Sequence, residues 1–182
     1  LDFIAQESQT VFAAVFELLA IDQFIIMGHS VGGGMSTCIA ADYTDQCIGL
    51  VTIAAQSMLE DLTVQGIWEA KEAFKAMGQL ARLEKYHGAK AQWVLDAWTE
   101  TWCDPQFAAW NLSEQLSRVK CPNLVLHGEL DEYATESQAR AFAEQTHGTS
   151  ELHILAGLNH MPHKENPELV LQHIAEFLAH LR

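Results

Sequence analysis

Residues 24–34 read FIIMGHSVGGG, and this stretch contains two structural signals in succession. The apolar run at 24–27 has two β-branched isoleucines at its centre, which is typical of a buried strand. The glycines at 32–34 open a helical segment that continues to about Tyr43. Between the two lies Gly28-His29-Ser30-Val31-Gly32, which matches the pattern G-x-S-x-G in the strand–turn–helix context that this pattern requires.

The turn at Ser30 explains the residue types around it. A sharp strand-to-helix turn strains its central residue and crowds the neighbours, so we expect side chains at Gly28 and Gly32 to clash. Such a turn would lift the Ser30 hydroxyl clear of the backbone at a helix N-terminus, where the helix dipole favours a developing negative charge. We therefore predict Ser30 as a nucleophile and the Val31 N–H as an oxyanion donor. A glycine-rich helix start selected only for close packing is the alternative interpretation.

A serine hydroxyl needs a base that accepts its proton and an acid that orients this base. In a strand–turn–helix architecture of this kind the chain order is Ser, then Asp or Glu, then His, with acid and base in loops at the carboxyl ends of strands. Asp131 follows a predicted strand at 123–127, and His160 follows a predicted strand at 151–156. We therefore predict Asp131 as the acid and His160 as the base.

Both loops also offer competing side chains. Glu129 and Glu132 flank Asp131, which is favoured because it lies three residues after the glycine that turns the chain. His163 competes with His160, and the two can also be interpreted as a His-x-x-His metal pair. No carboxylate-rich partner motif accompanies this pair, so we expect no metal, and we interpret His163 as a hydrogen-bonding partner within its loop.

Strands and helices alternate at both ends of the chain, which predicts βαβ units and a parallel sheet. Besides the elements already named, we predict helices at 4–20 and 136–145, a strand at 48–53, and a last helix with Asn166 as N-cap and Pro167 at its first position. The sheet core would comprise residues 1–56 and 119–182.

The middle of the chain, residues 57–118, lacks strand-like runs and holds all five tryptophans. We interpret it as an inserted helical lid, with a break between helices at Asp104-Pro105. Trp98 and Trp102 share a helical face. They either line an apolar substrate pocket or pack the lid.

Composition excludes several classes of function. The chain has 182 residues, about one ordinary domain, and its net charge of −14 would repel a phosphate backbone, so we expect no nucleic acid partner. The longest uninterrupted apolar run has six residues, so we expect no membrane-spanning helix. The four cysteines form no CxxC pair, which favours buried free thiols in a reducing, cytoplasmic location.

Three segments, 28–33, 121–131 and 157–167, together resemble the α/β-hydrolase superfamily, and the resemblance covers essentially the whole chain. The lid layout is similar to that of the valacyclovir-hydrolase-like and meta-cleavage-product-hydrolase-like branches. The resemblance implies an α/β fold, here the second half of the parallel sheet with flanking helices and an inserted helical lid. It also implies a Ser30–His160–Asp131 triad with Val31 as oxyanion donor, no cofactor, and a small-molecule ester as substrate.

The chain departs from the family at its beginning. In the family, four strands and a His-Gly loop that supplies a second oxyanion donor precede the helix with which this chain starts. We therefore expect a truncated chain whose strand at 24–27 offers an unpaired edge. Such a chain would associate with copies of itself through this edge and hydrolyse esters slowly. A catalytically impaired remnant that acts as a binding or self-associating module is the alternative function.

Two further residues narrow the chemistry. Ser30 stands where epoxide hydrolases and haloalkane dehalogenases need a carboxylate nucleophile. Met161 follows His160, whereas carbon–carbon bond hydrolases of the meta-cleavage branch commonly have tryptophan there. Ester hydrolysis through an acyl-enzyme is therefore the favoured reaction, and carbon–carbon bond hydrolysis is a second alternative.

Overall fold

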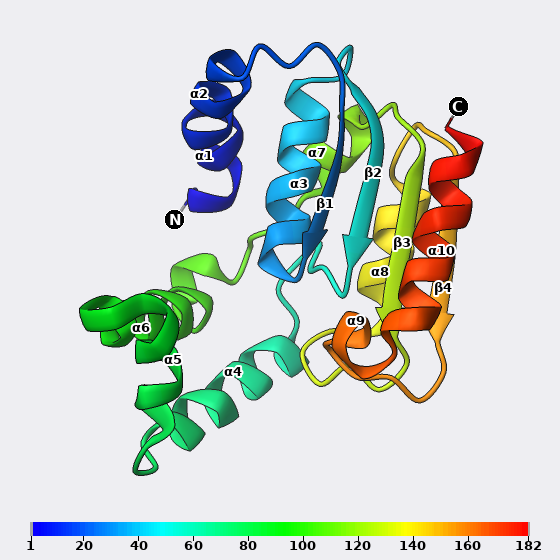
Figure 1. The fold of residues 1–182 in the computed structure, drawn as a ribbon. Helices are drawn as coiled ribbons and strands as arrows, with labels where there is room; N and C mark the ends of the chain where they lie inside the picture. The colour runs from blue at the N-terminus through cyan, green and yellow to red at the C-terminus, as the bar shows by residue number, and fades with distance from the viewer. Residues whose placement is uncertain (1, 182) are drawn as a thin grey trace. The chain divides into compact units, whose positions relative to one another are not determined.

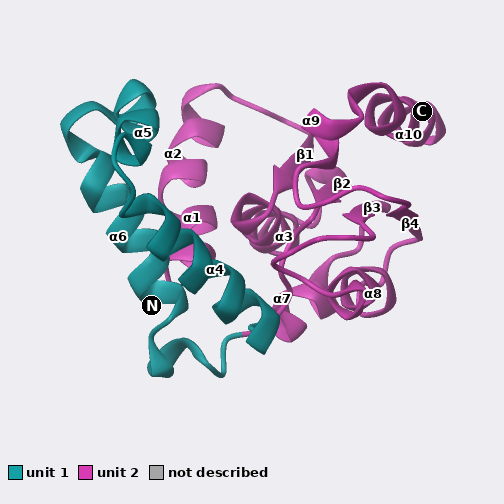
Figure 2. Cartoon of the chain, turned by 90° about the horizontal axis from the view of Figure 1, so that it is seen from below, with its two compact units in different colours: residues 1, 59–110 teal, residues 2–58, 111–182 magenta. Residues whose placement is uncertain are grey.

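The computed structural model describes residues 2–181, so the terminal positions of the predicted core lie outside the description. The chain divides into two compact units: a helical unit of residues 59–110, and a sheet unit formed by 2–58 and 111–181 (Figure 2). The helical unit is narrower than the predicted lid range of 57–118. Residues 111–118 join the sheet unit because helix α7 (Ser113–Arg118) packs on helix α3 (Val31–Asp42).

The sheet unit contains one four-stranded parallel sheet in the order β1-β2-β3-β4, which confirms the predicted fold class. Figure 1 shows the four arrows side by side and pointing the same way. The strands are β1 (Phe24–His29), β2 (Cys47–Ile53), β3 (Asn123–Gly128) and β4 (Ser150–Leu155). Because the strands are parallel, their carboxyl ends meet at one edge, where the loops after β1, β3 and β4 emerge.

Helices cover both faces of the sheet. Helices α3, α7 and α8 (Glu136–Glu144) lie on one face, and α10 (Pro167–His180) lies on the other (Figures 1 and 2). Asn166 caps α10 as predicted, because its side chain accepts a hydrogen bond from the Leu169 N–H. The apolar face of α10 packs on the sheet through one buried cluster: Val170, Ile174 and Phe177 against Val51, Ile53, Leu124, Leu126 and Leu155.

The predicted single helix at 4–20 is wrong in its continuity, because the structure has two helices, α1 (Phe3–Gln9) and α2 (Val11–Leu18). The backbone leaves the helical region at Thr10, whose φ and ψ are −117° and −89°. The Thr10 hydroxyl donates to the Gln6 carbonyl at 2.7 Å, a side-chain bond of the kind that competes with helix geometry. The apolar stripe therefore does not share one buried face: Ile4 is buried, but Val11, Val15 and Leu19 are exposed.

The helical unit contains α4 (Asp61–Phe74), α5 (Gln79–His87) and α6 (Ala91–Trp102), with the short 3₁₀ helices η1 (Gly88–Lys90) and η2 (Pro105–Phe107). The break predicted at Asp104-Pro105 is confirmed, since the Asp104 side chain caps η2. Trp102 is buried and packs edge-on against Phe107 and Trp110 at centroid distances of 5.2 and 5.3 Å. These contacts give Trp102 a packing role within the unit.

All four cysteines are free thiols, as predicted, and three of them are buried. The Sγ atoms of Cys47 and Cys121 lie 3.7 Å apart. Within residues 2–181, no helix has both the length and the apolar character that crossing a lipid bilayer would need.

Candidate active site

The turn between β1 and α3 has the strained geometry that the sequence predicts. Ser30 has a φ of 54° and a ψ of −128°, a region that residues with a side chain rarely adopt. Two backbone hydrogen bonds hold it there: the Ser30 N–H donates to Ile53 at 2.9 Å, and the Gly33 N–H donates to the Ser30 carbonyl at 2.9 Å. Val31 is the first residue of α3, as the oxyanion prediction requires.

The glycines around Ser30 differ in what they are needed for. A Cβ on Gly28 would lie 2.1 Å from the Gly32 carbonyl oxygen, which confirms the expected clash at Gly28. The expected clash at Gly32 is wrong, because a Cβ there would meet open space. Instead, the backbone carbonyl of Gly32 lies close to Gly28. Gly33 carries the second constraint instead, since its Cβ would lie 2.4 Å from the Cβ of Ala55.

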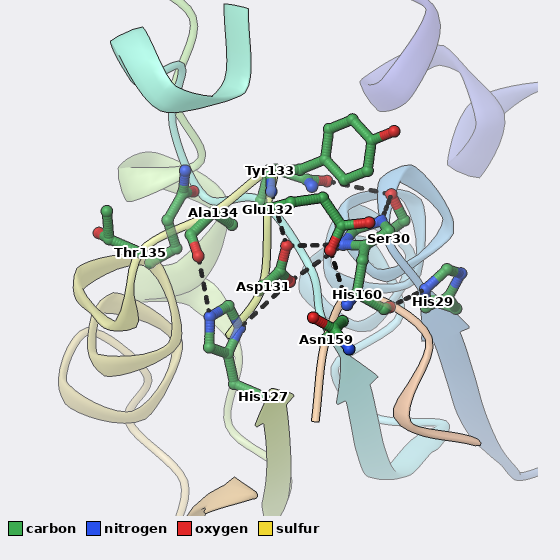
Figure 3. A network of polar contacts seen from close by, with 12 residues as sticks. His29, Ser30, His127, Asp131, Glu132, Tyr133, Ala134, Thr135, Asn159 and His160 are labelled. Carbon is green, nitrogen blue, oxygen red and sulfur yellow. Dashed lines mark hydrogen bonds and ion pairs between the residues drawn. The ribbon is translucent and has the colours of Figure 1, made fainter. Parts of the chain in front are cut away.

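Three of the predicted side chains meet at the carboxyl edge of the sheet (Figure 3). His160 Nε2 lies 3.0 Å from Ser30 Oγ, and His160 Nδ1 lies 3.0 Å from each carboxylate oxygen of Asp131. Asp131 and His160 are each only 7% exposed. The Asp131 carboxylate also accepts the Tyr133 N–H at 2.8 Å, which fixes its orientation. The imidazole is therefore held between a hydroxyl and a buried carboxylate.

The competing carboxylates contact backbone N–H groups of the His160 loop and not the imidazole ring. Glu132 Oε2 accepts the backbone N–H of His160 at 3.1 Å, and Glu129 Oε2 accepts that of Gly157 at 2.8 Å. Asp131 is the acidic residue of this loop whose carboxylate bonds to the imidazole ring. The structure thus distinguishes three acidic residues that lie within four positions of the sequence.

His163 does not fit the role predicted for it. Its Nδ1 is buried and has no hydrogen-bond partner within residues 2–181. Its ring packs edge-on against His29, with 4.6 Å between centroids, and burial lowers its pKa. Within the same residues, no cluster of three or more His, Cys, Asp or Glu side chains is arranged to hold a metal ion.

Sequence reasoning missed two histidines that lie behind the site. His29 Nε2 donates to the His160 carbonyl oxygen at 2.8 Å, and burial lowers the pKa of His29 to about 4. His127 is fully buried, its Nε2 lies 3.1 Å from the Ala134 carbonyl oxygen, and its Nδ1 lies 3.9 Å from Asp131 Oδ2. Burial also lowers the pKa of His127. Their positions were the available signal, since His29 directly precedes Ser30 and His127 lies near the end of β3, the strand before Asp131.

Gln56 is a third residue that the sequence did not single out. It is buried three residues after the end of β2, and its Oε1 lies 3.4 Å from Ser30 Oγ. The Ser30 hydroxyl has a single proton and a closer acceptor in His160 Nε2, so the contact with Gln56 is the weaker of the two.

The two loops that carry the acid and the base approach each other closely. A Cβ on Gly128 would lie 2.2 Å from the Asn159 carbonyl oxygen, so only glycine permits this approach. Glu165 Oε2 accepts the Asn159 N–H at 2.8 Å and its Oε1 accepts the Met161 N–H at 3.2 Å. The bond from the Asn159 N–H is the main cause that lowers the pKa of Glu165. The backbone on both sides of His160 is therefore tied down.

This geometry agrees with a family comparison, in which a model described as "Alpha/beta hydrolase family" matches residues 2–173. The chain belongs to the alpha/beta hydrolase family. The matched residues include those of both units. No curated protein sequence matches the chain.

Solved structures of other proteins share the fold of this family member. A membrane phospholipase A, described as a bacterial virulence factor, has 19% identity and a TM-score of 0.76, and the match covers 98% of this chain and 64% of the phospholipase. The esterase RhEst1 from Rhodococcus sp. ECU1013 has 19% identity and a TM-score of 0.69 over 98% of this chain and 73% of the esterase. A meta-cleavage product hydrolase from Pseudomonas fluorescens IP01 has 18% identity and a TM-score of 0.71 over 94% and 70%.

Identities this low show the fold alone. The three proteins also differ in their reactions, so the fold does not select one. This chain spans only 64% of the length of the phospholipase. The reaction must therefore be inferred from the site.

Proposed function

We propose that this hydrolase cleaves a small carboxylic ester through an acyl-enzyme formed on Ser30. The observation that carries the proposal is the position of the His160 ring: Nε2 lies 3.0 Å from Ser30 Oγ while Nδ1 lies 3.0 Å from both Asp131 oxygens. Both separations are hydrogen-bond distances, and this order of groups is the one that activates a serine hydroxyl.

In the proposed acylation step, Ser30 Oγ attacks the ester carbonyl carbon and gives its proton to His160 Nε2. The Asp131 carboxylate accepts the Nδ1–H and stabilises the imidazolium that forms. The Val31 N–H, at the N-terminus of α3, donates to the developing oxyanion, which the helix dipole also favours. His160 then gives the proton to the leaving alcohol.

Deacylation uses the same groups in reverse. His160 takes a proton from water, the resulting hydroxide attacks the acyl group on Ser30, and the carboxylic acid leaves as Ser30 recovers its proton. An oxyanion donor is worth about 2.7–4 kcal/mol of transition-state stabilisation, so the Val31 N–H contributes substantially to the proposed rate.

A fluorophosphonate probe tests the proposal, because it labels only an activated serine. We expect the protein to be labelled at Ser30 and to hydrolyse p-nitrophenyl esters. Ser30→Ala should abolish labelling and lower kcat by about a millionfold. Ser117→Ala is the matched control, since Ser117 is an exposed helix serine outside the site.

Three outcomes would redirect the proposal. A Ser30→Ala variant that turns over the ester at an undiminished rate would show that another residue is the nucleophile. An unlabelled gene product that still folds would favour the binding or self-associating remnant. Labelling at Ser30 together with turnover of a meta-cleavage product, and not of esters, would identify carbon–carbon bond hydrolysis instead.

A further inference from the structure

The backbone of His160 is held by two side chains that the mechanism above does not use. Glu132 Oε2 accepts the His160 N–H at 3.1 Å, and His29 Nε2 donates to the His160 carbonyl oxygen at 2.8 Å (Figure 3). Both polar groups of the peptide backbone at His160 are thus bonded to side chains and not to a strand or helix ladder. A loop residue normally obtains such restraint from secondary structure or water.

The two holding residues are the chain neighbours of the other two site residues. His29 directly precedes Ser30, and Glu132 directly follows Asp131. Each pair of chain neighbours therefore contacts His160 at two points. One member bonds to the imidazole ring (Ser30 or Asp131) and the other to the backbone (His29 or Glu132). We propose that Glu132 and His29 are positioning residues, which fix the imidazole of His160 through its backbone in register with Ser30 and Asp131.

The physical chemistry of the two bonds supports this role. The bond from the His160 N–H to a carboxylate is charge-assisted, and such bonds are stronger than those between neutral groups. His29 is suited to stay neutral, because burial lowers its pKa to about 4, and a neutral ring places no positive charge beside the imidazolium of His160. The ring centroids of His29 and His160 are 4.9 Å apart, so a charge on His29 would act at close range.

Displacement of a reacting group by about 1 Å can cost roughly a hundredfold in rate, because the hydrogen bonds to it must stay aligned. Glu165 holds the backbone at Asn159 and Met161, so loss of either bond would remove the restraint at His160 itself, whereas Asp131 and Ser30 would keep their own supports. The inference rests on the proposed function for its kinetic consequence. The orientation of the His160 ring, however, can be measured without turnover.

The first test compares the kinetics of two Glu132 variants of the protein. We expect Glu132→Ala, which removes the acceptor, to lower kcat roughly 10- to 100-fold with KM changed less than about twofold. Glu132→Gln keeps an acceptor oxygen and should stay within about threefold of the wild type. Glu144→Ala on α8 removes an exposed carboxylate outside both loops and should change neither parameter.

The second test uses ¹⁵N NMR of the histidine rings in the 182-residue chain. In the wild type we expect the His160 proton to reside on Nδ1, facing Asp131, whereas Glu132→Ala should populate the other tautomer measurably and Glu132→Gln should not. Absence of turnover in the wild type would overturn the proposed function but leave this tautomer measurement able to decide the positioning role. Equal kcat and equal tautomer populations in all Glu132 variants would overturn the inference.

A second pair of variants covers the case in which Glu132→Ala fails to fold. His29→Gln keeps an N–H donor near the His160 carbonyl, and His29→Ala removes it. We expect the alanine variant to lose kcat and the Nδ1–H tautomer, and the glutamine variant to recover most of both. If the two variants behave alike, His29 has only a packing role and the inference fails for this residue.

Discussion

The loops after β3 and β4 and the outer face of β1 differ in how fully their groups are partnered. In the loops, Asp131, Glu129 and Glu132 each accept a hydrogen bond from the other loop. On β1, by contrast, Ile25 and Met27 are 41% and 47% exposed. Within residues 2–181, β1 pairs only with β2. The side chains that meet at the site therefore all lie in the sheet unit, whereas Ile25 and Met27 on β1 remain partly exposed.

A depression lies beside the exposed side chains of β1. It has a volume of about 420 Å³ and is lined mainly by apolar side chains of β1 and α10, among them Met27, Val170 and Leu171. His29 and His163 also line it. Proteins rarely expose apolar surface of this kind without association. We therefore expect substitutions in the loops after β3 and β4 to alter catalysis, and substitutions on β1 to alter solubility.

Among the substitutions that test this contrast between the loops and β1, the largest effect should come from Asp131→Asn. The asparagine retains the shape but loses the charge that stabilises the imidazolium and fixes the tautomer of His160, so we expect kcat to fall about ten-thousandfold. Glu129→Gln should change kcat by less than about threefold, because its amide oxygen can still accept the Gly157 N–H. Ester turnover measured for the two variants checks this. A larger loss in Glu129→Gln would mean that the acid is wrongly assigned.

A smaller effect concerns stability, and it should distinguish the buried cluster between α10 and the sheet from the exposed face of β1. Phe177 is 2% exposed in the cluster between α10 and the sheet, so we expect Phe177→Ala to lower the free energy of unfolding by about 3–5 kcal/mol. Met27→Ala removes a half-exposed side chain and should cost less than about 1 kcal/mol, while it lowers self-association. Urea unfolding and light scattering measure both. Equal destabilisation by the two substitutions would show that the β1 face is covered.

The smallest effect concerns the pH dependence of stability. Burial lowers the pKa of His29 from 6.5 to about 4, so between these pH values the unfolded chain binds more protons than the folded one. The free energy of unfolding should therefore fall as the pH is lowered through this range. His160, His163 and Asp131 face His29, and burial shifts the pKa of His127 in the same direction. His29→Gln should thus reduce the slope and not remove it, as urea midpoints at pH 7 and pH 5 would show. An unchanged slope would contradict the burial of a neutral His29.

The elements that the sequence predicted best are those whose signals are local. The strand at 24–27 and the helix after Asn166 are recognisable because apolar periodicity and capping act within a few residues of the chain. The prediction of one helix at 4–20 was wrong because its local signal, the apolar periodicity, does not report the break that the structure shows at Thr10. Its apolar period continues through Thr10, where the backbone leaves the helical region, and the Thr10 hydroxyl also bonds to the Gln6 carbonyl.

The sequence by itself predicted the order of the proposed nucleophile, acid and base, because G-x-S-x-G and the two later loops after strands follow the chain order of this architecture. Only the tertiary structure decided which neighbouring side chain does what. Asp131 and Glu132 are adjacent in the chain, yet one carboxylate bonds to the ring of His160 and the other to its backbone. Successive side chains in a loop point in different directions, and which of them meets His160 depends on a partner loop 28 or 29 residues further along the chain.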